Sequence, residues 1–186
     1  MITRKEMTRM LLKEGLLSYL ANHSFESVTV TSLCKASGIT RSTFYLHYSN
    51  IMEIVDDLVD DAIAYSKPGM VDNNNLQTIA KTLSAASDSV SLREAYDSIF
   101  DRLPLCQRII RHKKYLPLFL DEQIAEYVLQ RIIRREKDRQ GLVMAEALGV
   151  SFDVGVSVFV FLVHGLYAIN KEYKWSQSDK WLEAQK

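Results

Sequence analysis

Apolar residues recur every three or four positions along most of the chain, the spacing that places them on one face of an α-helix. The first such stripe predicts a helix over residues 3–21, with an inner face formed by Leu12, Leu16, Leu17 and Leu20. A second predicts a helix over residues 51–66, with an inner face formed by Ile54, Val55, Leu58 and Ala62. The outer face of the first helix is expected to carry Arg4, Lys5 and Arg9.

Gly15 lies in the middle of the first predicted helix. A glycine there costs about 1 kcal/mol relative to alanine. We attribute it to the close approach of another helix, and we expect that helix to be the one at residues 51–66.

Between these two helices the pattern predicts two shorter ones joined by a tight turn. Thr29 or Thr31 can cap a helix that runs to about residue 37, because a threonine oxygen accepts from the free N–H groups of a first turn. Gly38 supplies the turn, where a left-handed backbone costs glycine little. Thr40 can cap the next helix, over residues 41–48.

The helix over residues 41–48 has two faces of different character. Two turns are too few to be stable alone, so neighbours must hold it, and Phe44 and Tyr48 are predicted to form the holding face. The side that points away carries Arg41, Ser42, Tyr45 and Leu46. A guanidinium, a small hydroxyl, a phenol and an apolar tip suit a helix that sits in a DNA major groove.

The helix over residues 51–66 is expected to begin with a capping box made by Asn50 and Glu53. Its acidic residues are interpreted as a solvated face, with a metal site as the alternative; they are Asp56, Asp57, Asp60 and Asp61. The run Lys67, Pro68 and Gly69 then breaks the pattern and places a domain boundary between residues 1–66 and 67–186.

Beyond the boundary the chain reads as helical throughout. Helices are predicted over residues 76–87, 92–103, 105–112, 117–139, 152–173 and 177–185. The run 154–169 is almost wholly apolar, but it is shorter than the roughly 20 residues that span a bilayer and it contains His164. A buried helix is therefore expected there, and no membrane segment. The fold class is predicted to be all-α.

Several short motifs follow one another in the first 58 residues. They are the run Leu17–Phe25, the entry Thr29-Val30-Thr31, the turn Gly38-Ile39-Thr40, and the helix motifs Thr43-Phe44-Tyr45 and His47-Tyr48. In this order and spacing, residues 7–58 resemble the DNA-binding domain of the TetR family of bacterial transcription regulators. The resemblance implies a three-helix head with a helix-turn-helix at about residues 29–48, linked by a fourth helix to a larger helical body.

The predicted DNA contacts follow from this resemblance and from the exposed side of the short helix. They are Thr29, Thr31, Thr40, Arg41, Ser42, Thr43, Tyr45, Leu46 and His47. Arg41 and Ser42 would reach base edges, Leu46 could pack on a thymine methyl, and the others would hold phosphates or seat the helix. Four positions depart from the family pattern. Ser24 and Ser42 stand where glycine is usual, Leu46 where an aromatic or basic residue is frequent, and Ile51 where a lysine is usual.

In proteins of this family the body forms a homodimer through its last two long helices and encloses a small-molecule pocket. The resemblance implies both for this chain. Aromatic and polar residues on helices that should face inward are the pocket candidates, although most are expected to be core: Tyr96, Phe100, Tyr115, Phe119, Tyr127, Phe161, His164 and Tyr167. Independently, the helix at 152–169 is apolar nearly all round and needs partners on more than one side, one of which can be a second copy.

Charge and composition narrow the function classes. The 186 residues carry no net charge, which argues against a protein that coats nucleic acid without sequence preference. Residues 1–50 carry six basic and three acidic side chains, a balance of +3, and the rest carries −3. A basic end on an acidic body favours an approach to phosphate through the amino-terminal part.

Cysteine and histidine usage points away from disulfides, metals and catalysis. Cys34 and Cys106 are far apart and suggest no disulfide framework, which fits the cytoplasm. The four histidines fall on separate segments and no catalytic or metal-binding motif is present, so no enzyme activity, cofactor or metal is expected.

The leading hypothesis is a homodimeric, cytoplasmic transcription regulator that binds a palindromic operator as a repressor and is released by a small-molecule effector. A second is a helical protein-interaction module or co-regulator that keeps the family head, which Ile51 and Leu46 motivate. A third is an enzyme on an all-α scaffold, which would need titratable residues to converge in the body.

Overall fold

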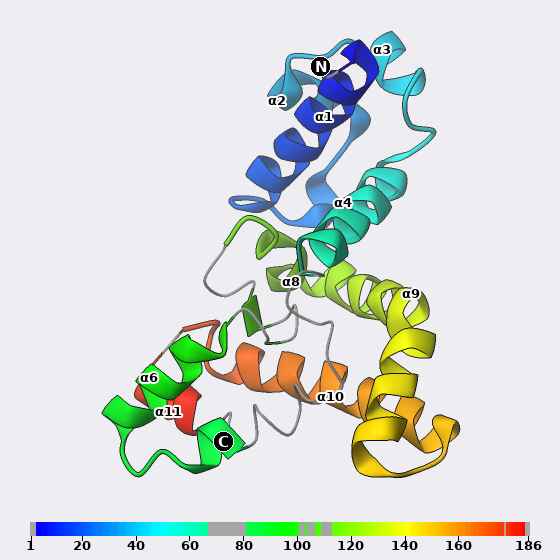
Figure 1. The fold of residues 1–186 in the computed structure, drawn as a ribbon. Coiled ribbons are helices and arrows are strands. Elements are labelled where there is room, and N and C mark those ends of the chain that lie inside the picture. The colour runs from blue at the N-terminus through cyan, green and yellow to red at the C-terminus, as the bar shows by residue number, and fades with distance from the viewer. Residues whose placement is uncertain are drawn as a thin grey trace. The chain divides into compact units, whose positions relative to one another are not determined.

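The computed structural model describes residues 3–66, 81–100, 103, 107–108, 113–176 and 178–184. All regular elements in these ranges are helical, and no strand occurs within them (Figure 1). The all-α prediction is confirmed. The predicted domain boundary at Lys67–Gly69 falls outside the described residues, as do residues 76–80 of the helix predicted at 76–87 and most of the helix predicted at 105–112.

The helices group into two compact units. Unit 1 comprises residues 1–62 and 113–131, and unit 2 comprises residues 63–112 and 132–186. The sequence did not predict that residues 113–131 join the amino-terminal helices. Helix α9 (Glu122–Leu148) contributes to both units, because the division falls after Arg131.

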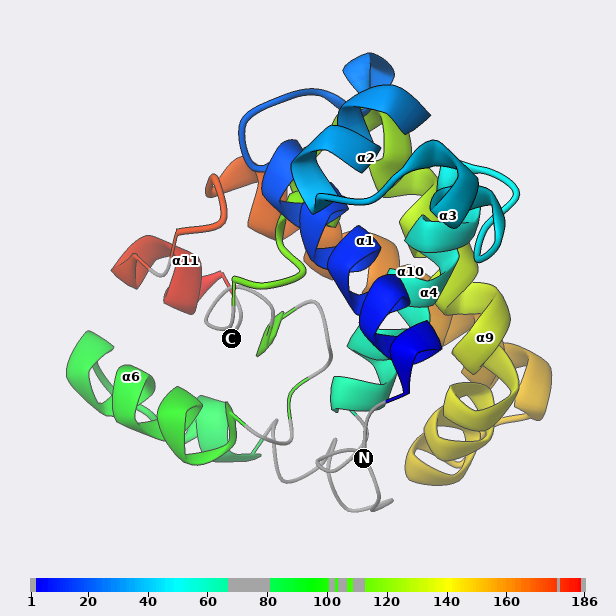
Figure 2. The same cartoon turned by 90° about the horizontal axis from the view of Figure 1, so that it is seen from above.

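Unit 1 is built on α1 and the helices that follow it along the chain. Its elements are α1 (Arg4–Leu20), the 3-10 turn η1 (Phe25–Ser27), α2 (Val30–Ser37), α3 (Arg41–Tyr45), α4 (Ile51–Ser66, up to residue 62), α8 (Pro117–Leu120) and the first part of α9. Figures 1 and 2 show α2 beside α1 in both views. The predicted inner stripes of α1 and α4 are both buried, so these apolar faces form the core of unit 1.

Gly15 marks a close helix approach, as predicted, but the partner is α2 and not α4. A Cβ at position 15 would collide with Ser37 Oγ and lie 3.1 Å from Ser37 Cβ. The small residue therefore lets the end of α2 rest on the middle of α1, which places the turn after α2.

The helix predicted over residues 117–139 is two helices. Asp121 has an extended backbone that separates α8 from α9, and its carboxylate accepts from the N–H groups of Gln123, at 2.9 Å, and of Phe25, at 2.5 Å. Helix α9 then continues to Leu148, past the predicted end. It passes through Gly141, where the missing side chain leaves room for Val156 of the next long helix.

Unit 2 contains α6 (Ser89–Ser98), the second part of α9, α10 (Phe152–Glu172) and α11 (Asp179–Glu183). The short α11 packs on α6 through Trp181, which is fully buried and meets the Tyr96 ring edge-on at a centroid distance of 5.2 Å. The Trp181 indole N–H also donates to Asn170 Oδ1 of α10 at 2.8 Å. These contacts fix the carboxyl-terminal helix to two others.

Helix α10 differs from its prediction. It was expected to be buried, yet its buried residues in the single chain are Gly155, Phe159 and Asn170, while Phe161 is 74% exposed. With 21 residues, it is the one helix of the described part of the chain that has the length and apolar composition to cross a membrane. Val158, Val160, Leu162 and Val163 are partly buried against the cluster of Ile133, Met144 and Phe159. Phe152, Val154 and Phe161 are exposed apolar residues of the same helix.

Two glycines of α10 give a matched test of its packing. Alanine at Gly155 would meet backbone atoms of α9, Gly141 O and Ala145 N, whereas alanine at Gly165 would meet no atom of the described chain within 4 Å. We expect Gly155→Ala to lower the free energy of unfolding by about 1–3 kcal/mol through overpacking. Gly165→Ala should raise it by up to about 1 kcal/mol through helix propensity. Urea unfolding followed by circular dichroism measures both, and shifts of the same sign would contradict the described α9–α10 contact.

Candidate nucleic-acid interface

The connection between α2 and α3 has the local geometry that the sequence predicted. Thr29 Oγ1 caps α2 by accepting from the Ser32 N–H at 3.0 Å, and Ser32 Oγ accepts from the Thr29 N–H at 2.9 Å. Gly38 ends α2 with φ of 65°, a left-handed conformation that suits glycine. Thr40 Oγ1 then caps α3 by accepting from the Thr43 N–H at 3.2 Å.

Helix α3 is shorter than predicted, since it has five residues and ends at Tyr45. The Leu46 N–H is shared between Ser42 O at 3.3 Å and Thr43 O at 3.2 Å, and the His47 N–H bonds to Phe44 O at 2.9 Å. Bonds to the third residue back tighten and close a helix. Leu46 and His47 therefore leave α3 in a turn.

The two faces of this segment are divided as predicted. Phe44 is fully buried and Tyr48 is 3% exposed, so both rings point into unit 1. Leu46 is 81% exposed, the largest value among the exposed large apolar residues of the described chain. The predicted contact residues that are exposed are Thr29, Thr31, Thr40, Arg41, Ser42, Tyr45 and Leu46, and those that are half-buried are Thr43 and His47.

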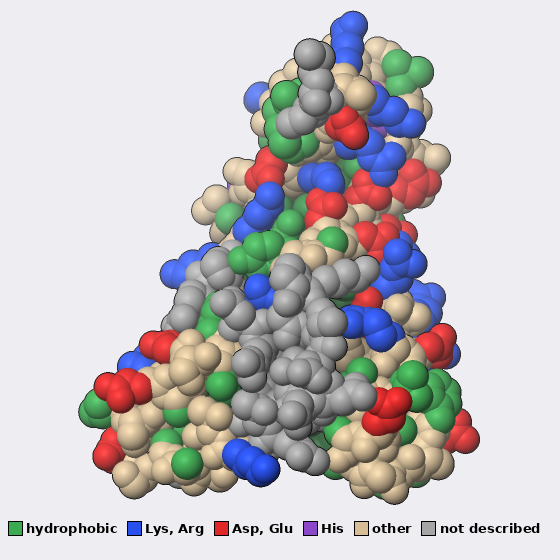
Figure 3. All heavy atoms as spheres, viewed as in Figure 1, with side chains coloured by type: hydrophobic (Ala, Val, Ile, Leu, Met, Phe, Trp, Pro, Cys, Tyr) green, Lys and Arg blue, Asp and Glu red, His purple; other side chains and the backbone are tan. Residues whose placement is uncertain are grey.

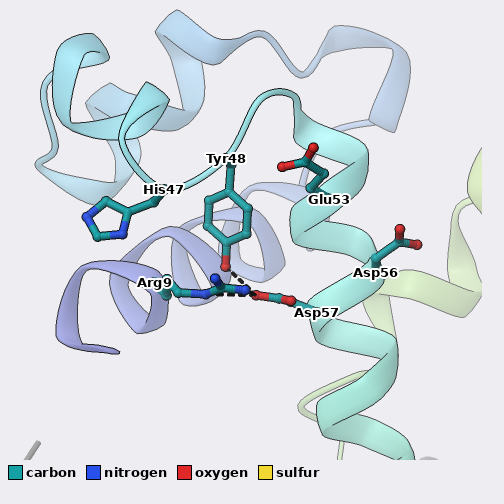
Figure 4. A pocket seen from close by; sticks show the side chains of 6 residues that line it. All are labelled: Arg9, His47, Tyr48, Glu53, Asp56 and Asp57. Atoms are coloured by element: carbon teal, nitrogen blue, oxygen red, sulfur yellow. Dashed lines mark hydrogen bonds and ion pairs between the residues drawn. The ribbon is translucent and has the colours of Figure 1, made fainter. Parts of the chain in front are cut away.

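Behind α3, Tyr48 is held by two residues from other helices (Figure 4). Its hydroxyl donates to Asp57 Oδ2 of α4 at 2.6 Å, and the Arg9 guanidinium of α1 lies over its ring, 4.8 Å from the centroid. Arg9 Nε donates to the same Asp57 oxygen at 3.1 Å. The prediction that Arg9 stays outside is wrong, because it is drawn to this carboxylate.

Burial and the contact with Asp57 set the pKa values of Tyr48 and Arg9 in this cluster. Burial raises the pKa of Tyr48 far above its ordinary value, and the hydrogen bond to Asp57 and the charge of Asp57 raise it further. The hydrogen bond to Asp57 likewise raises the pKa of Arg9. The phenol therefore remains a protonated donor and the guanidinium remains charged.

The aspartates of α4 are half-exposed and paired, so this face is less solvated than predicted. Asp57 and Asp61 bind Arg9 and Lys13 of α1. Because partners on both helices are four residues apart, they meet as a ladder along neighbouring helix faces. That matching spacing was the sequence signal for this contact.

The other pair of aspartates binds α9. Asp56 Oδ1 accepts from the Tyr127 hydroxyl at 2.6 Å and lies 3.0 Å from Arg131 Nε, and Asp60 Oδ2 lies 3.3 Å from Arg131 Nη2. Figure 3 shows acidic and basic side chains side by side on the surface over α1 and α4. We call the four aspartates with their partners on α1 and α9 the α4 seam. Among the described residues, no group of three or more His, Cys, Asp or Glu side chains is placed to hold a metal ion.

A hollow of about 240 Å³ opens beside the α4 seam, next to the turn that follows α3. It is lined by Arg9, His47, Tyr48, Glu53, Asp56 and Asp57 (Figure 4). His47 Nδ1 is buried here and has no hydrogen-bond partner in the described part of the chain. Asn50 caps α4 as predicted, because its Oδ1 accepts from the Glu53 N–H at 3.1 Å, but the Glu53 carboxylate accepts from the Ser49 N–H at 2.8 Å and not from Asn50.

The predicted pocket residues are divided between the two units. Those in unit 1 are Tyr115, Phe119 and Tyr127, and those in unit 2 are Tyr96, Phe100, Phe161, His164 and Tyr167. Tyr96, Phe100, Tyr115 and Phe119 are buried as core, whereas Phe161 faces solvent. A second hollow of about 460 Å³ in unit 1 is lined by residues 20–24 and 120–123 and includes none of them. The effector pocket stays a prediction.

The thiol of Cys34 is free and buried within α2, and burial raises its pKa although Arg41 acts in the opposite direction. Cys106 lies outside the described residues. Cys34 thus belongs to the core that supports α3.

Comparison of the chain with family models, with curated proteins and with solved structures finds no match. The functional argument therefore depends on the residues and geometry of unit 1.

Proposed function

We propose that this chain is a homodimeric transcription regulator that binds double-stranded DNA. In this proposal α2 and α3 form a helix-turn-helix, and α3 enters the major groove. One observation supports it above the others: the five-residue α3 buries Phe44 and leaves Arg41 and Ser42 exposed, and Leu46 directly after it is exposed too. The anchored helix therefore presents its outer side to solvent.

Each exposed side chain has a chemical partner on DNA. Arg41 carries the long cation that forms paired hydrogen bonds with a guanine, and Ser42 beside it can bond to a base edge. Leu46 and Tyr45 offer apolar surface to a thymine methyl. Thr29, Thr31 and Thr40 would bind phosphates, with Thr43 and His47 seating the helix.

The dimer and the repressor role belong to the same proposal. The uncovered apolar residues of α10 favour a second copy of the chain as its partner. Two copies related by a two-fold axis would set their α3 helices about 34 Å apart, one turn of duplex, on a palindromic operator. An effector would release the operator by binding more tightly to a form of the dimer in which the two α3 helices no longer fit successive major grooves.

One observation favours the alternative of a protein-interaction module. Leu46 is 81% exposed and could anchor in an apolar pocket of another protein, and Ile51 replaces a lysine that would grip phosphate. The salt dependence of binding distinguishes the two functions. Contacts with phosphates release counterions, so the affinity for DNA falls steeply as the salt concentration rises.

Arg41 provides the direct test. A duplex selected by the wild-type chain from a random pool would be titrated with wild type, Arg41→Ala and, as a matched control, Arg134→Ala, an exposed arginine of unit 2. We expect Arg41→Ala to lose about 1–3 kcal/mol of binding free energy through the lost guanine contact, and Arg134→Ala to lose none.

Fluorescence anisotropy at several salt concentrations measures both the affinity and its salt dependence. Selection of no duplex, or binding that salt leaves unchanged, would reject the DNA-binding function in favour of the interaction module.

Leu46 allows a test that changes a single methyl group. Replacing thymidine by deoxyuridine in the selected duplex removes only the C5 methyl that an apolar side chain can touch. At one thymidine position we expect this replacement to lower the affinity of the wild-type chain about fivefold, roughly the burial energy of one methyl group. The Leu46→Ala variant should bind the two duplexes equally. If Leu46→Ala retains the full discrimination, Leu46 does not contact the base.

A further inference from the structure

The carboxyl-terminal end of α3 is attached to unit 1 through Tyr48. Leu46 and His47 leave the helix in a turn, and Tyr48 is the next residue whose side chain is buried. The position of Leu46 at the outer surface therefore depends on where Tyr48 is fixed. The amino-terminal end is fixed separately, by the turn at Gly38 and the Thr40 cap.

Asp57 and Arg9 together hold Tyr48. Asp57 Oδ2 accepts from the Tyr48 hydroxyl at 2.6 Å and from Arg9, which also stacks on the Tyr48 ring (Figure 4). One carboxylate thus ties the segment after α3 to α4 and α1 together. Hydrogen bonds to a charged acceptor are the stronger kind and are also directional.

We infer that Asp57, acting through Tyr48 and Arg9, is a positioning residue that sets the register of the exposed side of α3 and so contributes to DNA sequence discrimination without touching DNA. This inference rests on the proposed function. Tyr48 is buried and cannot reach a phosphate. A binding surface needs its side chains held to within about half an ångström, and a five-residue helix cannot hold itself.

The chain contains a matched control for this contact. Tyr127 donates its hydroxyl to Asp56 Oδ1 at 2.6 Å, the distance found for Tyr48 and Asp57, and Asp56 is the preceding residue of α4. Tyr127 lies on α9 and not on the segment that follows α3. Tyr48→Phe and Tyr127→Phe therefore remove the same kind of bond from the same helix, and neither changes the net charge.

The experiment compares two duplexes of equal length and composition, one selected from a random pool by the wild-type chain and one scrambled. Anisotropy titrations give the ratio of the two affinities, and thermal melting confirms that each variant is folded. We expect Tyr48→Phe to reduce the ratio about tenfold, with the affinity for the scrambled duplex unchanged, since a bond to a charged group is lost. Tyr127→Phe should leave the ratio within about twofold of wild type.

Equal ratios for Tyr48→Phe and Tyr127→Phe would overturn the positioning role, because the bond would then only stabilise the fold. If Arg41→Ala loses discrimination while Tyr48→Phe keeps it, the proposed function stands and the positioning role falls. If the wild-type chain does not distinguish the duplexes, both fall. Should Tyr48→Phe fail to fold, the Arg9→Lys variant takes its place, because lysine keeps the positive charge but lacks the Nε donor. If folded Arg9→Lys has the same affinity ratio as wild type, the positioning role is rejected.

Discussion

A helix of five residues cannot fix its own position, so α3 depends on the neighbouring helices of unit 1 to hold it in place. Phe44 anchors the helix in the apolar core of α1 and α4, and Gly15 allows α2 to rest on α1 so that the turn at Gly38 starts α3 in place. Tyr48 closes the other end against Asp57. The outward side of α3 is therefore the one surface of this segment that has no structural task within unit 1 as described.

The α4 seam extends the same constraint to the rest of the unit. Asp57 and Asp61 bind α1, whereas Asp56 and Asp60 bind the first part of α9, so α4 is held on two sides. The partly exposed pairs are individually worth little, but the tyrosine hydroxyls and the shared Arg131 make them a network. Because α9 continues from unit 1 into unit 2 as one helix, the seam holds the helix that the two units share.

Local features of unit 1 could be predicted from sequence, and most contacts between distant segments could not. The caps at Thr29 and Thr40, the left-handed Gly38 and the buried faces of Phe44 and Tyr48 depend on residues within a few positions of each other. The partner of Gly15, the pairing of Asp56 with Arg131 and the exposure of α10 depend on how helices pack, which a periodic pattern does not encode. The end of α9 was missed for the same reason, since the predicted helix stops at residue 139, whereas α9 continues through Gly141, where it crosses α10.

The central claim is that the segment from Thr29 to His47 is the surface that meets DNA. Amide hydrogen exchange of the full chain, measured by mass spectrometry with and without the selected duplex, tests it most directly. The account predicts slower exchange in residues 29–47 on adding the duplex, with α10 unchanged. Protection confined to α10 or to unit 2, with residues 29–47 exchanging as in the free protein, would contradict it.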